Sequence, residues 1–92
     1  MKRKVYLVQS AIGQQATRYS FNAAMNDAAK GMVRDYAETL GLRGPWSLVN
    51  SGKESAPDDA CLTVHGWRTW KHDATGKTLR IVCNLQPEGI KP

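Results

Sequence analysis

The chain has 92 residues, of which 41% are hydrophobic and 23% are charged. This length allows one domain with one core, and the composition is typical of a folded globular protein rather than a disordered one. No apolar run reaches the roughly 18 residues that a membrane-spanning helix requires. Residues 1–13, MKRKVYLVQSAIG, lack the apolar stretch of a signal peptide. We therefore expect a single cytoplasmic domain over residues 1–92, with no membrane partner.

The charge balance is basic. Thirteen Lys and Arg against eight Asp and Glu give a formal net charge of +5. Such a charge favours encounter with RNA, DNA or acidic protein surfaces without giving specificity. It also serves simply to keep a small domain soluble, and the basic residues are spread along the chain rather than gathered in a block. The charge therefore indicates a bias towards anionic partners and no particular motif.

Short β-branched and aromatic segments predict strands at residues 4–10, at 16–21 and at about 46–50. The polar segment GKESAPDDA, residues 52–60, has the composition of a mobile loop. We expect the tail, residues 86–92, to be frayed.

One helix is predicted between residues 22 and 42. Its start is capped by Ser20 or Asn22, and Gly41 ends it in the left-handed conformation. Apolar residues recur at intervals of three and four, and they are Met25, Ala28, Ala29, Met32, Tyr36 and Leu40. Lys30 and Arg34 lie on the opposite side, where they either meet a phosphate backbone or form a solvated face with neighbouring acids.

Residues 65–83, HGWRTWKHDATGKTLRIVC, predict a β-hairpin. A three-residue loop with Gly76 in the left-handed position pairs Asp73 with Lys77. This register places Trp67 on the core face, together with Leu79, Ile81 and Cys83. It places on the outer face Arg68, Trp70, His72, Thr78, Arg80 and Val82. The whole chain therefore predicts an α+β fold, ββαβββ, with one α-helix packed on an antiparallel sheet of four to five strands.

The predicted outer face suggests a binding site centred on Trp70. An indole beside Arg68 and Arg80 can stack on a base while the guanidinium groups meet phosphates or carboxylates. His72 lies beside it, and Lys71 and Lys77 supply supporting charge. Alternatively, Trp70 and Arg80 form only a cross-strand cation–π pair.

Signals for catalysis are missing. Asp58 and Asp59 are adjacent loop residues without a third ligand, and His72 and Asp73 point to opposite faces of a strand. No zinc spacing, phosphate-binding glycine loop or nucleophile elbow is present. We therefore expect no enzyme, no catalytic or metal-binding residue, no cofactor and no small-molecule substrate. The two cysteines, Cys61 and Cys83, are offset by about five residues in the hairpin and are expected to remain thiols.

Two stretches carry a resemblance to a known class of proteins. They are ATRYSFNAAMNDAAKGMVRDYAETLG, an aromatic strand end running into an Ala-rich helix, and the hairpin WRTWKHDATGKTLRIVCNL. In architecture the chain resembles small phage-encoded anti-CRISPR proteins that inhibit type I surveillance complexes. The resemblance covers most of the chain and includes no diagnostic motif.

The resemblance implies a stoichiometric, non-enzymatic inhibitor in the host bacterial cytoplasm. Its partners would be Cas protein subunits, met at their acidic surfaces or through the guide RNA, and it would block hybridisation of target DNA. Many such inhibitors are acidic mimics of DNA, whereas this chain is basic. The anchors would be Arg68, Trp70 and Arg80, with support from Lys71, Lys77, Lys30 and Arg34. Two alternatives remain, a sequence-tolerant RNA- or DNA-binding module and a homodimeric interaction protein that pairs exposed sheet edges.

Overall fold

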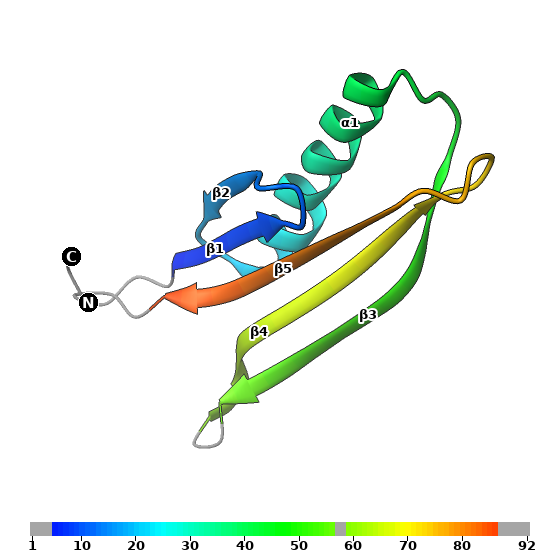
Figure 1. Cartoon of the computed structure of the whole chain (residues 1–92). Helices are drawn as coiled ribbons and strands as arrows, with labels where there is room; N and C mark the ends of the chain where they lie inside the picture. Colours follow the sequence, from blue (N-terminus) through cyan, green and yellow to red (C-terminus); the bar gives the residue numbers. More distant parts are fainter. Residues whose placement is uncertain (1–4, 57–58, 87–92) are drawn as a thin grey trace.

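The computed structural model describes residues 5–56 and 59–86, with side chains for 5–55 and 64–86. Two strands precede one helical segment, and three longer strands follow it (Figure 1). The predicted α+β class and ββαβββ order are confirmed. In chain order the elements are β1 (Val5–Ser10), β2 (Gln15–Arg18), η1 (Ala23–Ala28), α1 (Ala29–Leu40), β3 (Trp46–Ala56), β4 (Asp59–His72) and β5 (Thr78–Gln86).

The strands form one five-stranded sheet in the order β2-β1-β5-β4-β3, and each neighbouring pair is antiparallel. β5, the strand that follows β4 along the chain, lies in the middle of this sheet. It joins the β1–β2 hairpin to the β3–β4 hairpin, so Val5 is paired with Gln86. β2 and β3 are the two edge strands.

The predicted polar loop at residues 52–60 is wrong for most of its length. β3 continues to Ala56 and β4 begins at Asp59, while residues 57–58 lie outside the described part of the chain. Polar residues suit this strand because β3 is an edge strand whose outer side has no neighbouring strand. β2 in turn is shorter than predicted and ends at Arg18. Most of the predicted frayed tail, residues 87–92, lies outside the described residues.

The helical segment begins at Ser20, whose hydroxyl oxygen accepts a hydrogen bond from the Ala23 N–H at 3.0 Å. Asn22, the alternative cap, already has helical dihedral angles and caps no backbone group. Residues Ala23–Ala28 form a wide π-helical stretch, η1, in which the N–H of Ala29 donates to the carbonyl of Ala24. Gly41 ends α1 with a φ of 69°, as predicted.

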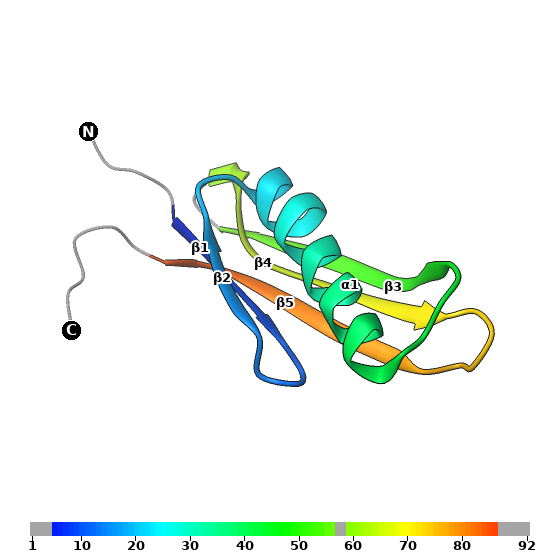
Figure 2. The same ribbon diagram turned by 90° about the horizontal axis from the view of Figure 1, so that it is seen from above.

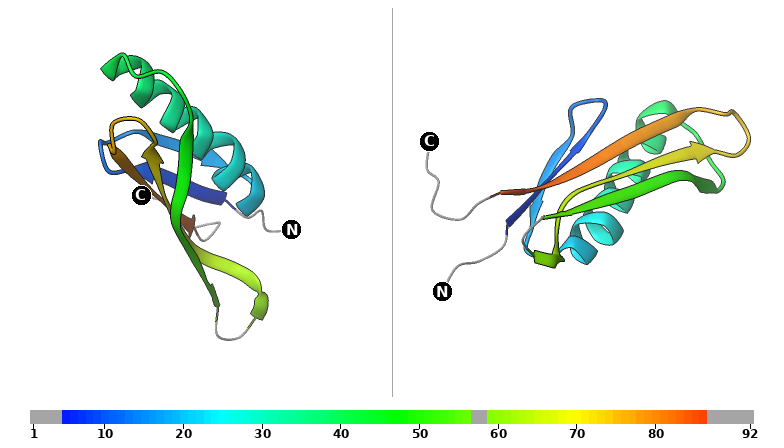
Figure 3. Two further views of the ribbon diagram at one scale, coloured as in Figure 1. Left: turned by 90° about the vertical axis from the view of Figure 1, so that its right-hand side faces the viewer. Right: turned by 90° about the horizontal axis from the view of Figure 1, so that it is seen from below.

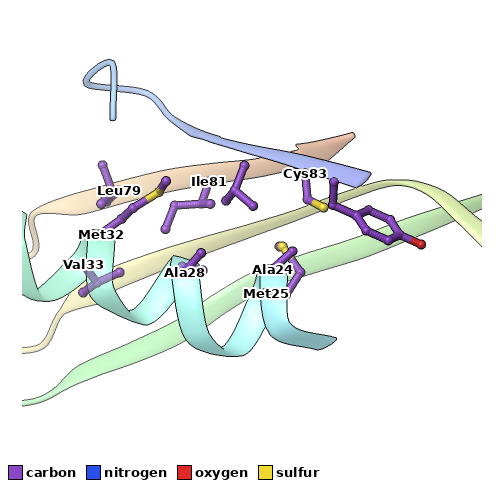
Figure 4. Packing of buried hydrophobic residues seen from close by; sticks show 11 residues of the cluster. Ala24, Met25, Ala28, Met32, Val33, Leu79, Ile81 and Cys83 are labelled. Atoms are coloured by element: carbon purple, nitrogen blue, oxygen red, sulfur yellow. The ribbon is translucent and has the colours of Figure 1, made fainter. Parts of the chain in front are cut away.

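The core lies between this helical segment and one face of the sheet (Figure 4). Met25, Ala28, Ala29 and Met32 are buried there as predicted, whereas Leu40 is 40% exposed. Among the described side chains, the buried apolar residues are Tyr6, Val8, Ala24, Met25, Ala28, Ala29, Met32, Val33, Leu79, Ile81 and Cys83. Alanines on the helix allow it to pack close to β1 and β5.

The β4–β5 hairpin closes with four loop residues, 73–76, instead of the three predicted. The N–H of His72 donates to the carbonyl of Lys77 at 2.7 Å, and the N–H of Gly76 donates to the carbonyl of His72 at 2.8 Å. Gly76 is left-handed as predicted, with a φ of 79°. The extra loop residue shifts the register by one, so Trp67 lies opposite Val82 and Trp70 opposite Leu79. A shift of one residue exchanges the two faces of a strand.

Only one face of the sheet is covered within the described residues. The helical segment lies on a single side in both further orientations (Figures 2 and 3). Seen from below, the strands lie in front of the helix and no other described element covers them. We call this uncovered side the open face. No helix of the described chain is long and apolar enough to cross a membrane.

Candidate functional site

Three residues of the predicted binding site, two of them anchors, lie on the wrong face for an exposed site. Leu79 and Ile81 are buried against the helix, and their partners across the β4–β5 ladder are Trp70 and Arg68. Because paired residues share a face, both side chains lie on the helix side. His72 also lies there, paired with Trp46. The predicted outer cluster of Arg68, Trp70 and His72 is therefore wrong.

Arg68 is held against the start of the helix. One guanidinium nitrogen, Nη1, donates to the carbonyl of Met25 at 3.1 Å and to Oδ1 of Asn26 at 3.0 Å. Hydrogen bonds from a charged donor contribute about 1.5–3 kcal/mol each in a partly buried setting. Arg68 therefore ties β4 to η1 and is committed to the fold.

His72 links two loops and is buried, with 2% of its surface exposed. Its Nε2 lies 2.6 Å from the carbonyl oxygen of Arg43, and its Nδ1 lies 2.8 Å from the hydroxyl of Thr75. A carbonyl accepts only, so Nε2 carries the proton and Nδ1 accepts from Thr75. The ring is 5.1 Å from that of Trp46. These contacts give His72 a structural role in joining the α1–β3 connection to the hairpin tip.

The remaining predicted cations are exposed but dispersed. Arg80 and Lys71 lie on the open face, on the same side as their partners Thr69 and Thr78. Lys77 follows the hairpin loop. Lys30 and Arg34 are exposed on opposite flanks of α1. Lys30 lines a hollow together with Trp46 and Trp70, whereas Arg34 lines a different hollow beside β2. The structure therefore brings Arg80 and Lys71 together and separates them from the helix cations.

Trp67, which was predicted to face the core, lies instead on the open face, where Trp70 was predicted. Its ring lies over Gly52 of β3, so closely that a Cβ on Gly52 would be 2.1 Å from Cζ2 of the indole. The indole N–H donates to Oδ1 of Asn50 at 3.2 Å. Trp67 is partly exposed. The ring is therefore held against the strand backbone on one side and fixed in orientation by Asn50.

A second ring extends this aromatic surface along β4. His65 lies two residues before Trp67, and the two ring centroids are 5.4 Å apart. Nδ1 of His65 is 2.6 Å from Oδ1 of Asn84 on β5. Because an amide oxygen accepts only, Nδ1 carries the proton, and in the neutral ring Nε2 is left as an acceptor.

The open face combines these rings with polar and basic groups. Residues paired across neighbouring strands form rows on this face. The row through Trp67 continues to Val82, Gln9 and Gln15. The row through His65 continues to Asn84, Leu7 and Thr17. A shallow hollow of about 260 Å³ lies beside the first row and is lined by Gln9, Ser10, Ala11, Arg80 and Val82. Glu54, opposite His65, is the acidic group that the register places on this face.

The described residues give no indication of metal chemistry, since no group of three or more His, Cys, Asp or Glu side chains is positioned to hold an ion. The side chains of Cys61 and Asp59, and all of Asp58, lie outside what the structure describes. In the core, burial raises the pKa of the Cys83 thiol to about 11. Burial, and then the nearby Cys83, also raise the pKa of the Tyr6 hydroxyl.

The face of β5 could be predicted from the sequence, but the face of β4, and with it the exposure of Trp67, could not. Leu79, Ile81 and Cys83 were placed on the core face correctly, and that placement is confirmed. The face of β4 depended on the loop length alone, because both loop lengths accept Gly76 in the left-handed position.

Searches of protein-family models, curated proteins and solved structures found no match to this chain.

Proposed function

We propose that the protein binds single-stranded nucleic acid on the open face of its sheet. The observation that supports this most is the partly exposed Trp67 ring, which lies over Gly52 beside the ring of His65. Bases of a single strand stack on such rings, and each stacked base contributes about 1–3 kcal/mol. Two adjacent rings provide two stacking positions.

The fixed orientation of Trp67 favours affinity. Its N–H is bonded to Asn50, and its ring rests on the Gly52 backbone. A ring held in place before binding loses little conformational freedom when a base stacks on it, so less of the interaction energy is offset. Asn84, Gln9 and Thr69 surround it with amide and hydroxyl groups that suit base edges.

The cations suit a phosphate backbone that passes one side of the rings. Arg80 is two residues from Val82, the partner of Trp67, so it is a diagonal neighbour at about 7–8 Å. Lys71 lies further along β4 in the same direction, and both residues are exposed. Bases would stack near Trp67 while phosphates follow Arg80 and Lys71, which agrees with the net charge of +5.

The test is a fluorescence-anisotropy titration with a labelled twelve-nucleotide RNA and the matching DNA over a series of salt concentrations. We expect affinity to fall with salt, and Trp67→Ala to weaken binding by roughly tenfold or more. Arg80→Ala and Lys71→Ala should each reduce the salt slope by about one unit or somewhat less. Arg68→Met removes a cation from the other face and serves as the matched control. Absence of binding at low salt, or full binding by Trp67→Ala, would contradict the proposal.

A second proposal is the function implied by the resemblance, inhibition of a type I CRISPR–Cas surveillance complex. It is favoured by the ββαβββ order on which the resemblance rests. In this case the open face would meet guide RNA or a Cas subunit, and no catalytic step is involved. Both proposals take the protein to be cytoplasmic, and the second places it in the cytoplasm of a bacterial host.

The two proposed functions predict different bound partners in an affinity pull-down. A tagged protein incubated with lysate of a CRISPR-bearing bacterium should retain Cas subunits and guide RNA after nuclease treatment if it is an inhibitor. It should bind free oligonucleotides weakly in that case. Recovery of mixed nucleic acid that nuclease and salt remove would instead support the first proposal and contradict the second.

A further inference from the structure

A small apolar hollow lies on the helix side of the sheet, away from the open face. It has a volume of about 170 Å³ and is lined by Lys30 and Val33 of α1, Trp46 of β3 and Trp70 of β4. Small-molecule sites usually measure about 300–1,000 Å³, so this hollow has room for one side chain rather than for a whole ligand.

Exposed apolar side chains extend from the hollow to the edge of the sheet. Leu48 is paired with Trp70 and therefore shares its face, yet 44% of its surface is exposed. Val49 follows in an irregularity of the ladder and is 53% exposed. Both belong to β3, an edge strand, so the hollow opens beside an unpaired backbone. Apolar groups and a free strand edge at one place are typical of a docking site for an extended peptide.

Two polar groups define what such a peptide must carry. The indole nitrogen of Trp70 is buried and has no hydrogen-bond partner among the described residues. A buried donor without a partner is unfavourable, so a small movement of the indole that opens this N–H to an acceptor oxygen of a ligand would be favoured. Lys30 is the charged residue of the lining. The site therefore favours an apolar side chain next to acceptor oxygens that carry negative charge.

We propose that this hollow binds one apolar side chain of an extended acidic segment from a partner protein, with the segment running along β3. The apolar side chain packs between Trp46 and Trp70, and a carboxylate of the segment meets Lys30. Tryptophans dominate many such interfaces because they bury large areas with little loss of freedom. The site is separate from the nucleic-acid proposal, since it uses the opposite side of the sheet.

A second copy of this chain fits the site less well. The ladder irregularity at Val49, another between Glu54 and Ser55, and Lys53 on the edge are features that discourage edge-to-edge pairing of sheets. A short extended peptide pairs with only a few residues of β3, so it tolerates these irregularities. We treat self-association as an outcome that the experiment must detect.

The test is a ¹H–¹⁵N nuclear magnetic resonance titration of the full chain that follows the indole N–H signals. The Trp70 signal is assigned with Trp70→Phe. The probe is the peptide acetyl-Asp-Glu-Leu-Asp-Glu-amide, and two matched peptides replace its Leu by Ala or its four acids by Lys. We expect the acidic leucine peptide to shift the Trp70 signal saturably, and Lys30→Glu to weaken this binding by roughly tenfold or more. Trp67→Ala should leave it unchanged.

Several results would overturn the proposal. One is an unmoved Trp70 signal at millimolar peptide, and another is an equal response to the alanine or lysine peptide. A Trp70 signal that shifts on dilution of the protein alone would assign the site to a second copy. A shift caused by single-stranded RNA would assign it to nucleic acid. An unmoved Trp70 signal, or an equal response to the control peptides, would leave the nucleic-acid proposal intact. That proposal concerns the open face, and its titration is followed at Trp67.

Discussion

The indole of Trp67 fills the space that a side chain on Gly52 would need. A Cβ at residue 52 would lie 2.1 Å from Cζ2 of the ring, which no real pair of carbon atoms tolerates. The same relationship occurs on the other face, where a Cβ on Gly66 would lie 2.5 Å from Cε1 of Phe21. A glycine on each hairpin strand thus lets an aromatic ring rest directly on the sheet, once on the open face and once on the core face.

Gly52→Ala should therefore displace the Trp67 ring while leaving the fold largely intact. Because the ring is partly exposed, it can swing away from the new methyl group, and we expect a loss of stability of about 1 kcal/mol. The swing breaks the hydrogen bond to Asn50, so oligonucleotide affinity should fall as in Trp67→Ala. Anisotropy and thermal melts measure the two effects. Gly66→Ala is the control, since Phe21 packs against the core and the cost there should appear in stability instead.

Trp70→Ala should destabilise the protein while Trp67→Ala largely does not. Trp70 packs against the buried core and Trp67 lies on the open face. Truncation of a fully buried Trp costs about 3–5 kcal/mol, so roughly 2–4 kcal/mol is expected for the partly buried Trp70. Urea denaturation of the two variants measures this difference. The opposite order would mean that the register of the β4–β5 hairpin is shifted by one residue.

Arg68→Met should lower stability without altering nucleic-acid binding. The methionine preserves much of the apolar stem but loses the hydrogen bonds to the carbonyl of Met25 and to Asn26. We expect a loss of about 1–3 kcal/mol, measured by urea denaturation. Unchanged stability combined with weaker oligonucleotide binding would show that Arg68 faces a partner and not the helix.

Cys83 should resist thiol reagents, and its burial should make stability decline in alkali. Its pKa is raised to about 11 by burial, from an ordinary value of 9.0. Between these values the unfolded chain has released the proton and the folded chain has kept it, so the free energy of unfolding falls as pH rises from about 9 to 11. We expect Cys61→Ser protein to react with Ellman's reagent at pH 8 only as fast as it unfolds. Cys83→Ala should flatten the alkaline decline, although Tyr6 contributes a part of it.

The sequence allowed the fold class, the element order and the helix ends to be predicted, because these depend on local patterns. The three- and four-residue spacing of Met25, Ala28 and Met32 and the left-handed Gly41 are signals of this kind. The length of β3 was missed because an edge strand tolerates polar residues that elsewhere indicate a loop. The pairing of β5 between β1 and β4 joins distant segments and has no local signal.

The candidate site was predicted less well than the fold. The basic and aromatic composition of the hairpin indicated a binding surface, but one loop residue decided whether Trp67 or Trp70 faced outward. Loops of three and four residues differ little in sequence requirements, so the faces of β4 remained open. The exposed Arg80 was placed correctly because its strand was oriented by Leu79 and Ile81.

The central place of β5 means that the sheet is completed only when the last of its five described strands has left the ribosome. Before that strand emerges, β1 and β4 have no shared neighbour, and Tyr6 and Val8 lack the strand that pairs beside them. Pairing of β1 with β5 joins segments that are far apart in the sequence and so raises the contact order, which slows folding. Chains truncated before Thr78 would expose two unpaired strand edges and should aggregate rather than fold in part. Synthesis of β5 is therefore the step that commits the sheet to its structure.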